Sequence, residues 1–96
     1  MPQLPRAPKS STPSRVHLTR HARNRIRRRR PFVITEEDVK AVLQEPEADE
    51  ADEDEARNAW GRIRRNWWLR VTYSRERHGV VVLTVVARKR GPKGTR

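Results

Sequence analysis

Apolar and polar residues alternate along residues 66–74, NWWLRVTYS, and this period of two predicts a β-strand. Residues 80–90, VVVLTVVARKR, are apolar on both faces over most of their length, as expected of a strand inside a sheet. The RERHG sequence between them predicts a hairpin loop in which Gly79 adopts a positive φ. Shorter stretches at 15–19 and 60–65 predict two further strands. In the strand predicted over residues 66–74, one face holds Trp67, Leu69, Val71 and Tyr73, and the other holds Trp68, Arg70, Thr72 and Ser74.

A first helix is predicted over residues 20–30, RHARNRIRRRR, directly after the earliest strand. Ala22 and Ile26 lie four residues apart and share one helical face, which should meet the sheet. Seven arginines fill most of the remaining positions. The helix should end before Pro31, because the residue that precedes a proline disfavours the α conformation.

The strongest helix signal lies in residues 34–46, ITEEDVKAVLQEP. Thr35 is a suitable N-cap, and Asp38 stands three residues later, at the spacing of a capping box. Three carboxylates fill the first turn, where the helix dipole stabilises negative charge. Pro46 marks the end of the helix. The apolar stripe that should face the core consists of Val39, Val42 and Leu43.

Three segments are predicted to lack regular structure. Residues 1–14 contain four prolines and three serines, too few apolar groups to offset the entropy cost of ordering, and residues 91–96 are similar. Both ends are therefore predicted to be disordered tails. Residues 45–56 carry eight carboxylates and nothing larger than proline to pack, which predicts a solvated, mobile acidic loop. The folded domain is expected over residues 15–90.

The order of these elements predicts a small α+β domain, with an antiparallel sheet and both helices on one face. The chain has no cysteine, which excludes a disulfide framework, a thiolate metal site and a cysteine nucleophile. Its longest apolar run, GVVVLTVVA, is too short to span a bilayer, and its N-terminus lacks the pattern of a signal peptide. We therefore expect a cytoplasmic protein that does not enter a membrane.

The net charge of +11 is unevenly distributed along the 96 residues. Residues 1–34 carry +10, residues 35–55 carry −10 and residues 56–96 carry +11. Arginine outnumbers lysine by nineteen to four. Because guanidinium groups pair bidentately with phosphate and stack on bases, this bias favours a nucleic-acid partner. A GC-rich genome would also explain the excess of arginine over lysine, but it would not explain the net charge.

The succession HLTRHARNRI, ITEEDVKAVLQEPE, WLRVTYS and GVVVLTVVA resembles a little-characterised bacterial domain family placed beside the RelE and BrnT toxins. The resemblance covers about residues 16–88. It implies a compact βααβββ fold and a toxin-like protein that acts on RNA or on the ribosome. RelE-like toxins are endoribonucleases paired with antitoxins, so the resemblance also implies an antitoxin partner. The motifs that carry it are His21-Ala22 with Arg25, Ile34 to Val39, Pro46, Val71 with Tyr73, and Val82 to Val86.

Candidate catalytic residues for RNA cleavage are His21, Arg70 and Tyr73. An imidazole can remove the proton of a 2′-hydroxyl, a tyrosine can supply a proton, and a guanidinium can stabilise the phosphorane. The alternative for His21 is structural, in which it caps or orients the first helix against the sheet. No cofactor is expected. No metal site is expected either, because His17 and His21 are separated by a strand–helix junction and the carboxylates lack EF-hand spacing.

Candidate nucleic-acid-binding residues are the cations of the two basic blocks and one tryptophan. Trp68 either offers an indole for stacking of unpaired bases or covers the end of the sheet. The acidic loop either folds back onto the basic face in place of a phosphate backbone or is a solvated linker. The binding set comprises Arg20, Arg25, Arg28, Arg29, Arg64, Arg65, Trp68, Arg88 and Arg90.

Two functions are consistent with these features. The first is an RNA- or ribonucleoprotein-binding toxin-like domain, with endoribonuclease activity of the RelE type. The alternative is a non-catalytic phage or mobile-element protein that binds a host protein or a nucleic-acid enzyme. Geometry distinguishes them, because an enzyme should gather His21, Tyr73 and two arginines around one concavity.

Overall fold

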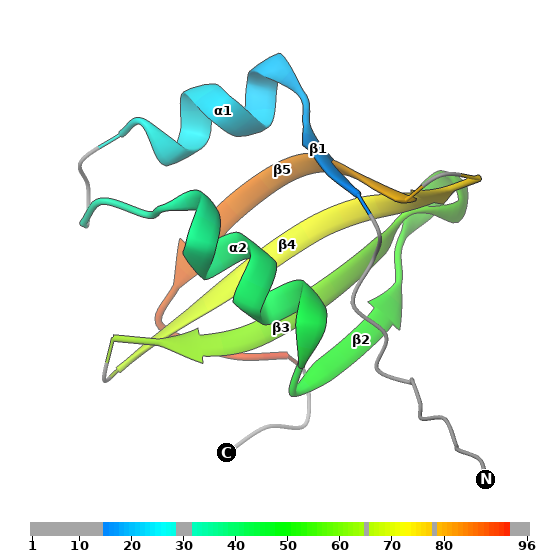
Figure 1. The fold of residues 1–96 in the computed structure, drawn as a ribbon. Coiled ribbons are helices and arrows are strands. Elements are labelled where there is room, and N and C mark those ends of the chain that lie inside the picture. Colours follow the sequence, from blue (N-terminus) through cyan, green and yellow to red (C-terminus); the bar gives the residue numbers. More distant parts are fainter. Residues whose placement is uncertain (1–14, 29–31, 65, 78, 93–96) are drawn as a thin grey trace, which may run out of the picture.

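The computed structural model describes residues 15–28, 32–64, 66–77 and 79–92. The predicted N-terminal tail lies outside the described residues, as do residues 93–96. The elements in chain order are β1 (Val16–Leu18), α1 (Arg20–Ile26), α2 (Glu36–Gln44), β2 (Ala48–Ala51), the 3₁₀ turn η1 (Glu53–Glu55), β3 (Arg57–Ile63), β4 (Trp67–Glu76) and β5 (Gly79–Arg88) (Figure 1).

The five strands form one mixed sheet in the order β1-β5-β4-β3-β2. Neighbours from β2 to β5 are antiparallel, whereas β1 runs parallel to β5, with Val16 opposite Val80 and Leu18 opposite Val82. The prediction of an antiparallel sheet is therefore wrong for β1. This strand pairs with the last strand of the chain, so no hairpin turn sets its direction.

The acidic segment contains a strand, so the prediction of a mobile loop is wrong for Ala48–Ala51. These residues form β2 and pair with β3 from Trp60 to Arg57. The side chains of an edge strand can remain in solvent while its backbone is paired, which accommodates a carboxylate-rich sequence. The chain thus has four strands after the helices, one more than βααβββ.

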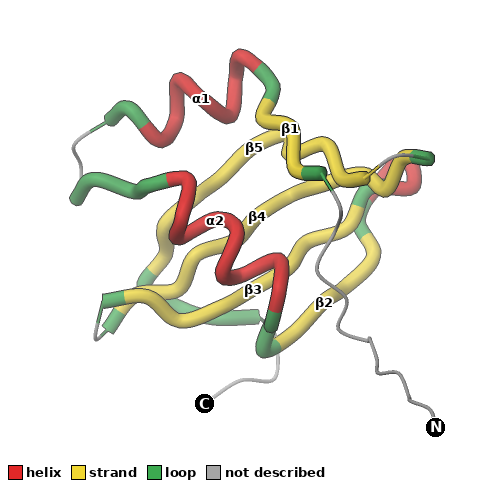
Figure 2. The backbone as a smooth tube through the Cα atoms, viewed as in Figure 1, coloured by secondary structure: helices red, strands yellow, loops and turns green. Residues whose placement is uncertain are grey.

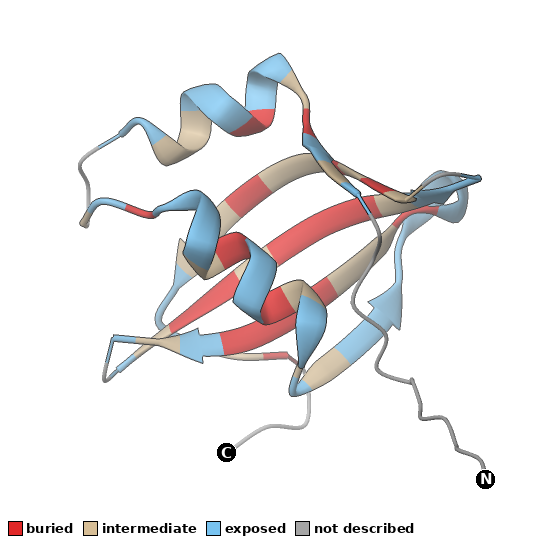
Figure 3. Ribbon diagram, viewed as in Figure 1, coloured by how far each residue is buried: buried red, intermediate tan, exposed pale blue. Residues whose placement is uncertain are grey.

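Both helices lie on the same face of the sheet (Figure 2). α1 packs on β5 and β1, and α2 packs on β3 and β4. The buried residues follow this interface, as Figure 3 shows for the strands beneath α2. The alternation predicted for 67–74 is confirmed, because every second residue from Leu69 points into the core. The fully buried side chains include Ala22, Val39, Leu69, Val71 and Val82.

The two helices differ in how well their ends were predicted. α2 has the expected capping box, with the Thr35 hydroxyl accepting from the Asp38 amide and the Asp38 carboxylate accepting from the Thr35 amide. α1 ends at Ile26 instead of continuing to residue 30. Its last predicted turn consists of four successive arginines, where like charges repel at helical spacing and a proline follows.

The ends of the sheet also depart from the predicted boundaries. β3 begins at Arg57, three residues before the predicted start at residue 60. The β4–β5 turn agrees with the prediction, because Gly79 adopts a positive φ of 149°. After β5, Gly91 packs against the indole of Trp68, and Pro92 is buried. The folded unit therefore extends beyond residue 90. No helix in the described part of the chain is long and apolar enough to cross a membrane.

The closest approach of α2 to the sheet depends on Gly61. A methyl group added at Gly61 would lie 2.9 Å from Cγ2 of Val42, in the middle of the core. We predict that Gly61→Ala lowers the free energy of unfolding by about 1–3 kcal/mol, because the helix must move outward.

Chemical denaturation of Gly61→Ala, Val42→Ala and the double variant checks this prediction. Removing the Val42 methyls makes room for the new side chain, so the double variant should be more stable than the sum of the single costs implies. Strictly additive costs would contradict the close contact.

Candidate nucleic-acid interface

α1 is fixed along an outer edge of β5 that no described strand covers beyond Val82. The hydroxyl of Thr19 caps the helix by accepting from the Ala22 amide at 3.1 Å, and it donates to the carbonyl of Leu83 at 3.1 Å. Further along, Nε of Arg25 donates to the carbonyl of Val85 at 3.4 Å. These bonds satisfy edge carbonyls of β5 and hold one flank of the helix against it.

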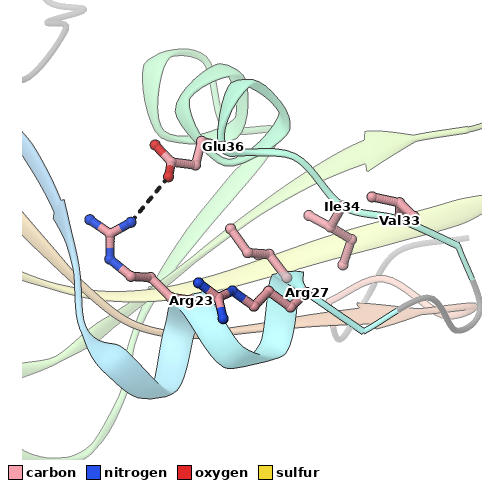
Figure 4. A pocket seen from close by; sticks show the side chains of 6 residues that line it. Arg23, Arg27, Val33, Ile34 and Glu36 are labelled. Atoms are coloured by element: carbon pink, nitrogen blue, oxygen red, sulfur yellow. Dashed lines mark hydrogen bonds and ion pairs between the residues drawn. The ribbon is translucent and has the colours of Figure 1, made fainter.

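The opposite flank of α1 presents arginines to two adjoining hollows. The first, of about 570 Å³, lies between α1 and the chain leading into α2, and the second, of about 450 Å³, lies between α1 and β1. Arg23 and Arg27 line both hollows, and Figure 4 shows them in the first. The first is completed by Ile26, Val33, Ile34 and Glu36, and the second by His17, Leu18, Arg20 and Asn24.

Most of the charge on this flank is not neutralised within the described part of the chain. Arg23 forms an exposed ion pair with Glu36 at 3.3 Å, whereas Arg20 and Arg27 have no ion-pair partner among the described residues. Among the residues that the structure describes, Glu36 is the only carboxylate that lines either hollow. We call the flank formed by Arg20, Arg23 and Arg27 the arginine stripe. It is suited to binding an extended anion.

A family model described as "Domain of unknown function (DUF4258)" matches residues 18–87. The chain belongs to this family. The matched region runs from the last residue of β1 nearly to the end of β5, so it contains the arginine stripe, both helices and strands β2, β3 and β4. No curated protein and no solved structure matches the chain.

Within this DUF4258 domain, the three candidate catalytic residues do not meet. His21 is exposed on the first turn of α1 and lines neither hollow. Tyr73 is 2% exposed and lies between the sheet and the helices. Arg70 is on the other face of β4, opposite Trp60 of β3. Two residues separated by an odd number of positions on one strand point to opposite faces, so Arg70 and Tyr73 cannot share a concavity.

Tyr73 has a structural partner in the acidic strand. Its hydroxyl donates to Oδ2 of Asp49 at 2.6 Å, and Oδ1 of the same carboxylate accepts from Nε of Arg57 at 2.7 Å. Burial and the hydrogen bond to Asp49 raise the pKa of Tyr73. The hydrogen bond to Asp49 is likewise the largest cause that raises the pKa of Arg57. This triad ties β2, β3 and β4 together.

Arg70 lies beside Trp60 on the face that the helices leave uncovered. Its guanidinium stands 5.9 Å from the centre of the Trp60 ring. Burial lowers the pKa of Arg70, and the nearby Arg88 lowers it further. Nε of Arg70 and the indole nitrogen of Trp60 are both buried without a hydrogen-bond partner. Arg70 is therefore partly desolvated and lies away from the arginine stripe.

The predicted nucleic-acid-binding residues are dispersed over several surfaces. Arg20 and Arg28 are exposed on and after α1, whereas Arg25 is held at the β5 edge. Arg64 is engaged in structural contacts at the β3–β4 turn, and Arg88 and Arg90 are exposed at the end of β5 and just beyond it. Trp68 is buried, at 8% exposure, under Arg62 and Gly91, so it offers no free face for stacking. Arg29 and Arg65 lie outside the described residues.

Two residues of the arginine stripe, Arg23 and Arg27, are absent from the set predicted from sequence. From this region the prediction chose Arg20, Arg25, Arg28 and Arg29, of which Arg25 turns toward β5 and Arg29 lies outside the described residues. A signal for the other flank exists, because positions 20, 23 and 27 share one side of a helix. Sequence spacing alone cannot decide which of the two arginine flanks faces the second helix.

The described residues contain no group of three or more histidine, aspartate or glutamate side chains that could hold a metal ion. The carboxylates of the acidic segment are instead spread along β2 and η1, and two of them are paired with arginines of β3. This region contributes ion pairs rather than a coordination sphere.

We predict that Tyr73→Phe lowers the free energy of unfolding at neutral pH by about 1–2 kcal/mol, through loss of the bond to Asp49. At alkaline pH, the free energy of unfolding of Tyr73→Phe should also depend less on pH than that of the wild type. Because the folded state raises the pKa of Tyr73, its contribution is complete below about pH 10, the ordinary pKa of tyrosine, and is lost as the pH rises through the folded value.

Denaturation curves of the wild type and of Tyr73→Phe between pH 7 and pH 11 check this effect, since other titrating groups are common to both proteins. The difference in stability should shrink above about pH 10. A constant difference across the range would contradict a shifted tyrosine.

Proposed function

We propose that this domain binds the phosphate backbone of RNA through the arginine stripe and acts as a binding module rather than as a nuclease. The observation that carries the proposal is the set of three arginines on one flank of α1, two of them without partners, beside two hollows that contain a single carboxylate. Arg20 and Arg27 are seven residues apart, about 10 Å along the axis. Successive nucleotides of a stacked strand rise about 3.4 Å, so the two side chains reach different phosphates.

The distribution of acids supports this assignment. β2, which belongs to the acidic segment 45–56, lies at the opposite edge of the sheet from the β1 and β5 strands that α1 contacts. Two carboxylates of this segment pair with β3, where Asp49 binds Arg57 and Glu47 lies 3.9 Å from Arg62. The acidic segment thus neutralises part of the C-terminal basic block and leaves α1 positively charged. An anionic ligand is attracted to one edge of the domain and repelled by the other.

The dispersal of His21, Arg70 and Tyr73 supports binding over cleavage. General acid–base catalysis needs both proton-transfer groups within hydrogen-bond reach of the same phosphodiester. His21 stands alone on the surface of α1, and the Tyr73 hydroxyl is committed to Asp49 inside the fold. Among the described residues that line the two hollows, the possible proton-transfer groups are His17 in one hollow and Glu36, paired with Arg23, in the other, so neither hollow brings two such groups together.

The choice of RNA rests on the resemblance to the RelE and BrnT toxins. The chain shares with that pattern one strand, two helices and then a run of strands, and it adds the acidic edge strand β2. In this proposal the domain keeps an RNA-binding surface of the toxin type without its catalytic constellation. A ribonucleoprotein, which displays folded RNA on its surface, is a suitable target.

We predict that Arg27→Gln and Arg20→Gln each weaken RNA binding about fivefold at low salt, equivalent to about 1 kcal/mol. Each should also lower the slope of log affinity against log salt by about 0.7–0.9, because one phosphate contact is lost. Arg77→Gln is the matched control, since it removes the same charge from the exposed β4–β5 turn.

Binding is measured by fluorescence anisotropy of labelled RNA over a series of salt concentrations. Equal losses for Arg27→Gln and Arg77→Gln would reduce the effect to net charge and contradict a localised site. Gel analysis of the RNA afterwards tests for cleavage. RNA that is cleaved by the wild type and left intact by His21→Ala would replace the binding module with an enzyme.

A further inference from the structure

A partly exposed aromatic pair lies at the end of the sheet where the β3–β4 turn meets the chain leading into α2. Phe32 and Trp67 pack edge to face, with ring centres 5.4 Å apart and planes at 80°. Phe32 contacts the hydrophobic core from its margin, whereas Trp67 is not among the residues packed on that core. Trp67 is therefore only partly buried, and its burial comes from contacts outside that core.

Two cations flank the aromatic pair. The guanidinium of Arg64 stands 4.7 Å from the centre of the Phe32 ring, and the ammonium of Lys89 stands 5.2 Å from the centre of the Trp67 ring. Arg64 is fixed in place, because it donates to the carbonyl of Val33 at 3.0 Å and lies 3.6 Å from a carboxylate oxygen of Asp38. Lys89 has no ion-pair partner among the described residues and can move aside.

Trp67 differs from the other two tryptophans of the chain. Trp60 and Trp68 are only 7% and 8% exposed, and they pack edge to face against each other on the opposite side of the sheet. Trp67 is thus the one indole of the three that is only partly buried. Any ligand that approaches from solution meets this ring and not the buried pair.

The aromatic pair adjoins the arginine stripe. Val33, which is 50% exposed, lines the hollow beside Arg23 and Arg27, and Phe32 is the preceding residue. Figure 4 shows Val33 and Ile34 forming the wall of this hollow across from Arg27. A polymer that lies along the arginines is therefore led toward Phe32 and Trp67.

We propose that Trp67, supported edge-on by Phe32, stacks on an unpaired base of the RNA whose backbone lies on the arginine stripe. The domain would then select single-stranded over double-stranded RNA. This inference rests on the proposed function and names the form of RNA that the same surface takes. The bases of a duplex are already stacked and paired, so they cannot reach an indole outside the helix.

The energies of the competing contacts favour an incoming base. Stacking of one base on an aromatic side chain changes affinity about 5- to 150-fold, as judged by its removal. The exposed contact between Lys89 and the indole, which the base would displace, corresponds to a factor of only about 2 to 5. After displacement, the ammonium of Lys89 remains close enough to pair with a phosphate of the same strand.

Charge favours this occupant over an apolar segment of a protein. Arg64 and Lys89 lie over the aromatic pair, and the acid Asp38 is already engaged by Arg64. An apolar peptide would bury these cations without compensating charge. The nucleotide that carries the base brings its own phosphate, which compensates the positive charge of these cations.

Three variants of the full chain test the inference. Trp67→Leu removes the aromatic face but keeps an apolar side chain, Trp67→Phe restores a ring, and Phe32→Leu removes the edge contact. Each is compared with the wild type for binding to an unstructured single-stranded RNA and to a duplex of matched length at one salt concentration. Thermal melting of each protein serves as the control for folding.

Trp67→Leu should weaken single-strand binding about 5- to 150-fold and change duplex binding less than about twofold. Trp67→Phe should recover most of the loss. In the wild type, single-stranded RNA should quench tryptophan fluorescence and duplex RNA should not, since Trp67 is the one indole that is partly accessible to solvent. This last measurement needs no substitution and remains informative if a variant fails to fold.

Equal wild-type affinity for single strands and duplexes, with no quenching by either, would overturn the inference and leave the arginine stripe as a site for phosphate alone. Single-stranded DNA that binds as tightly as RNA would show that the site reads bases without the 2′-hydroxyl, which still supports stacking. Failure to bind any nucleic acid at low salt would instead overturn the proposed function itself.

Discussion

The attachment of α1 to the outer edge of β5 determines which arginines of this helix the domain presents to a ligand. Thr19 joins the helix cap to the Leu83 carbonyl, Arg25 bonds the Val85 carbonyl, and Ala22 lets the helix approach the sheet closely. Leu83 has no counterpart on β4, because the register shifts between Thr72 and Tyr73. Such an irregular edge offers carbonyls that a helix can cap. Once one flank of α1 is held there, the other must present its arginines to the groove beside α2.

The fold also places the acidic segment and the described part of the first basic block of the sequence at opposite edges of the sheet. The acidic segment becomes the edge strand β2, on the far side of the sheet from α1, and its carboxylates are drawn to Arg57, Arg62 and Tyr73. The first basic block retains its charge because only Glu36 reaches it by an ion pair in the described part of the chain. The domain therefore has an acidic edge, whose charge is only partly neutralised by these contacts, and a basic edge, and Phe32 of the aromatic pair directly precedes Val33 in the lining of the basic hollow.

Short-range patterns predicted much of the fold and little of the site. Thr35 and Asp38 form the expected capping box, Gly79 takes a positive φ, and Leu69 and Val71 face the core, because each of these depends on residues within a few positions. The site involves distant partners. Arg23 and Arg27 line hollows that are completed by the chain leading into α2 and by β1, and Arg23 pairs with Glu36, thirteen residues later. Trp67 packs against Phe32, which is 35 positions earlier in the chain.

By itself, the sequence determined an α+β domain of the DUF4258 family, its helix caps, the alternation of its longest strands and an uneven, strongly basic charge. Only the tertiary structure decided that β1 runs parallel to β5, that residues 48–51 of the acidic segment form a strand, and that the helices cover the Tyr73 face of β4 and leave the Arg70 face uncovered. The physical reason is that periodicity and capping are local energies. Strand partners and the outward face of a helix are set by contacts between residues that the chain brings together only when it folds.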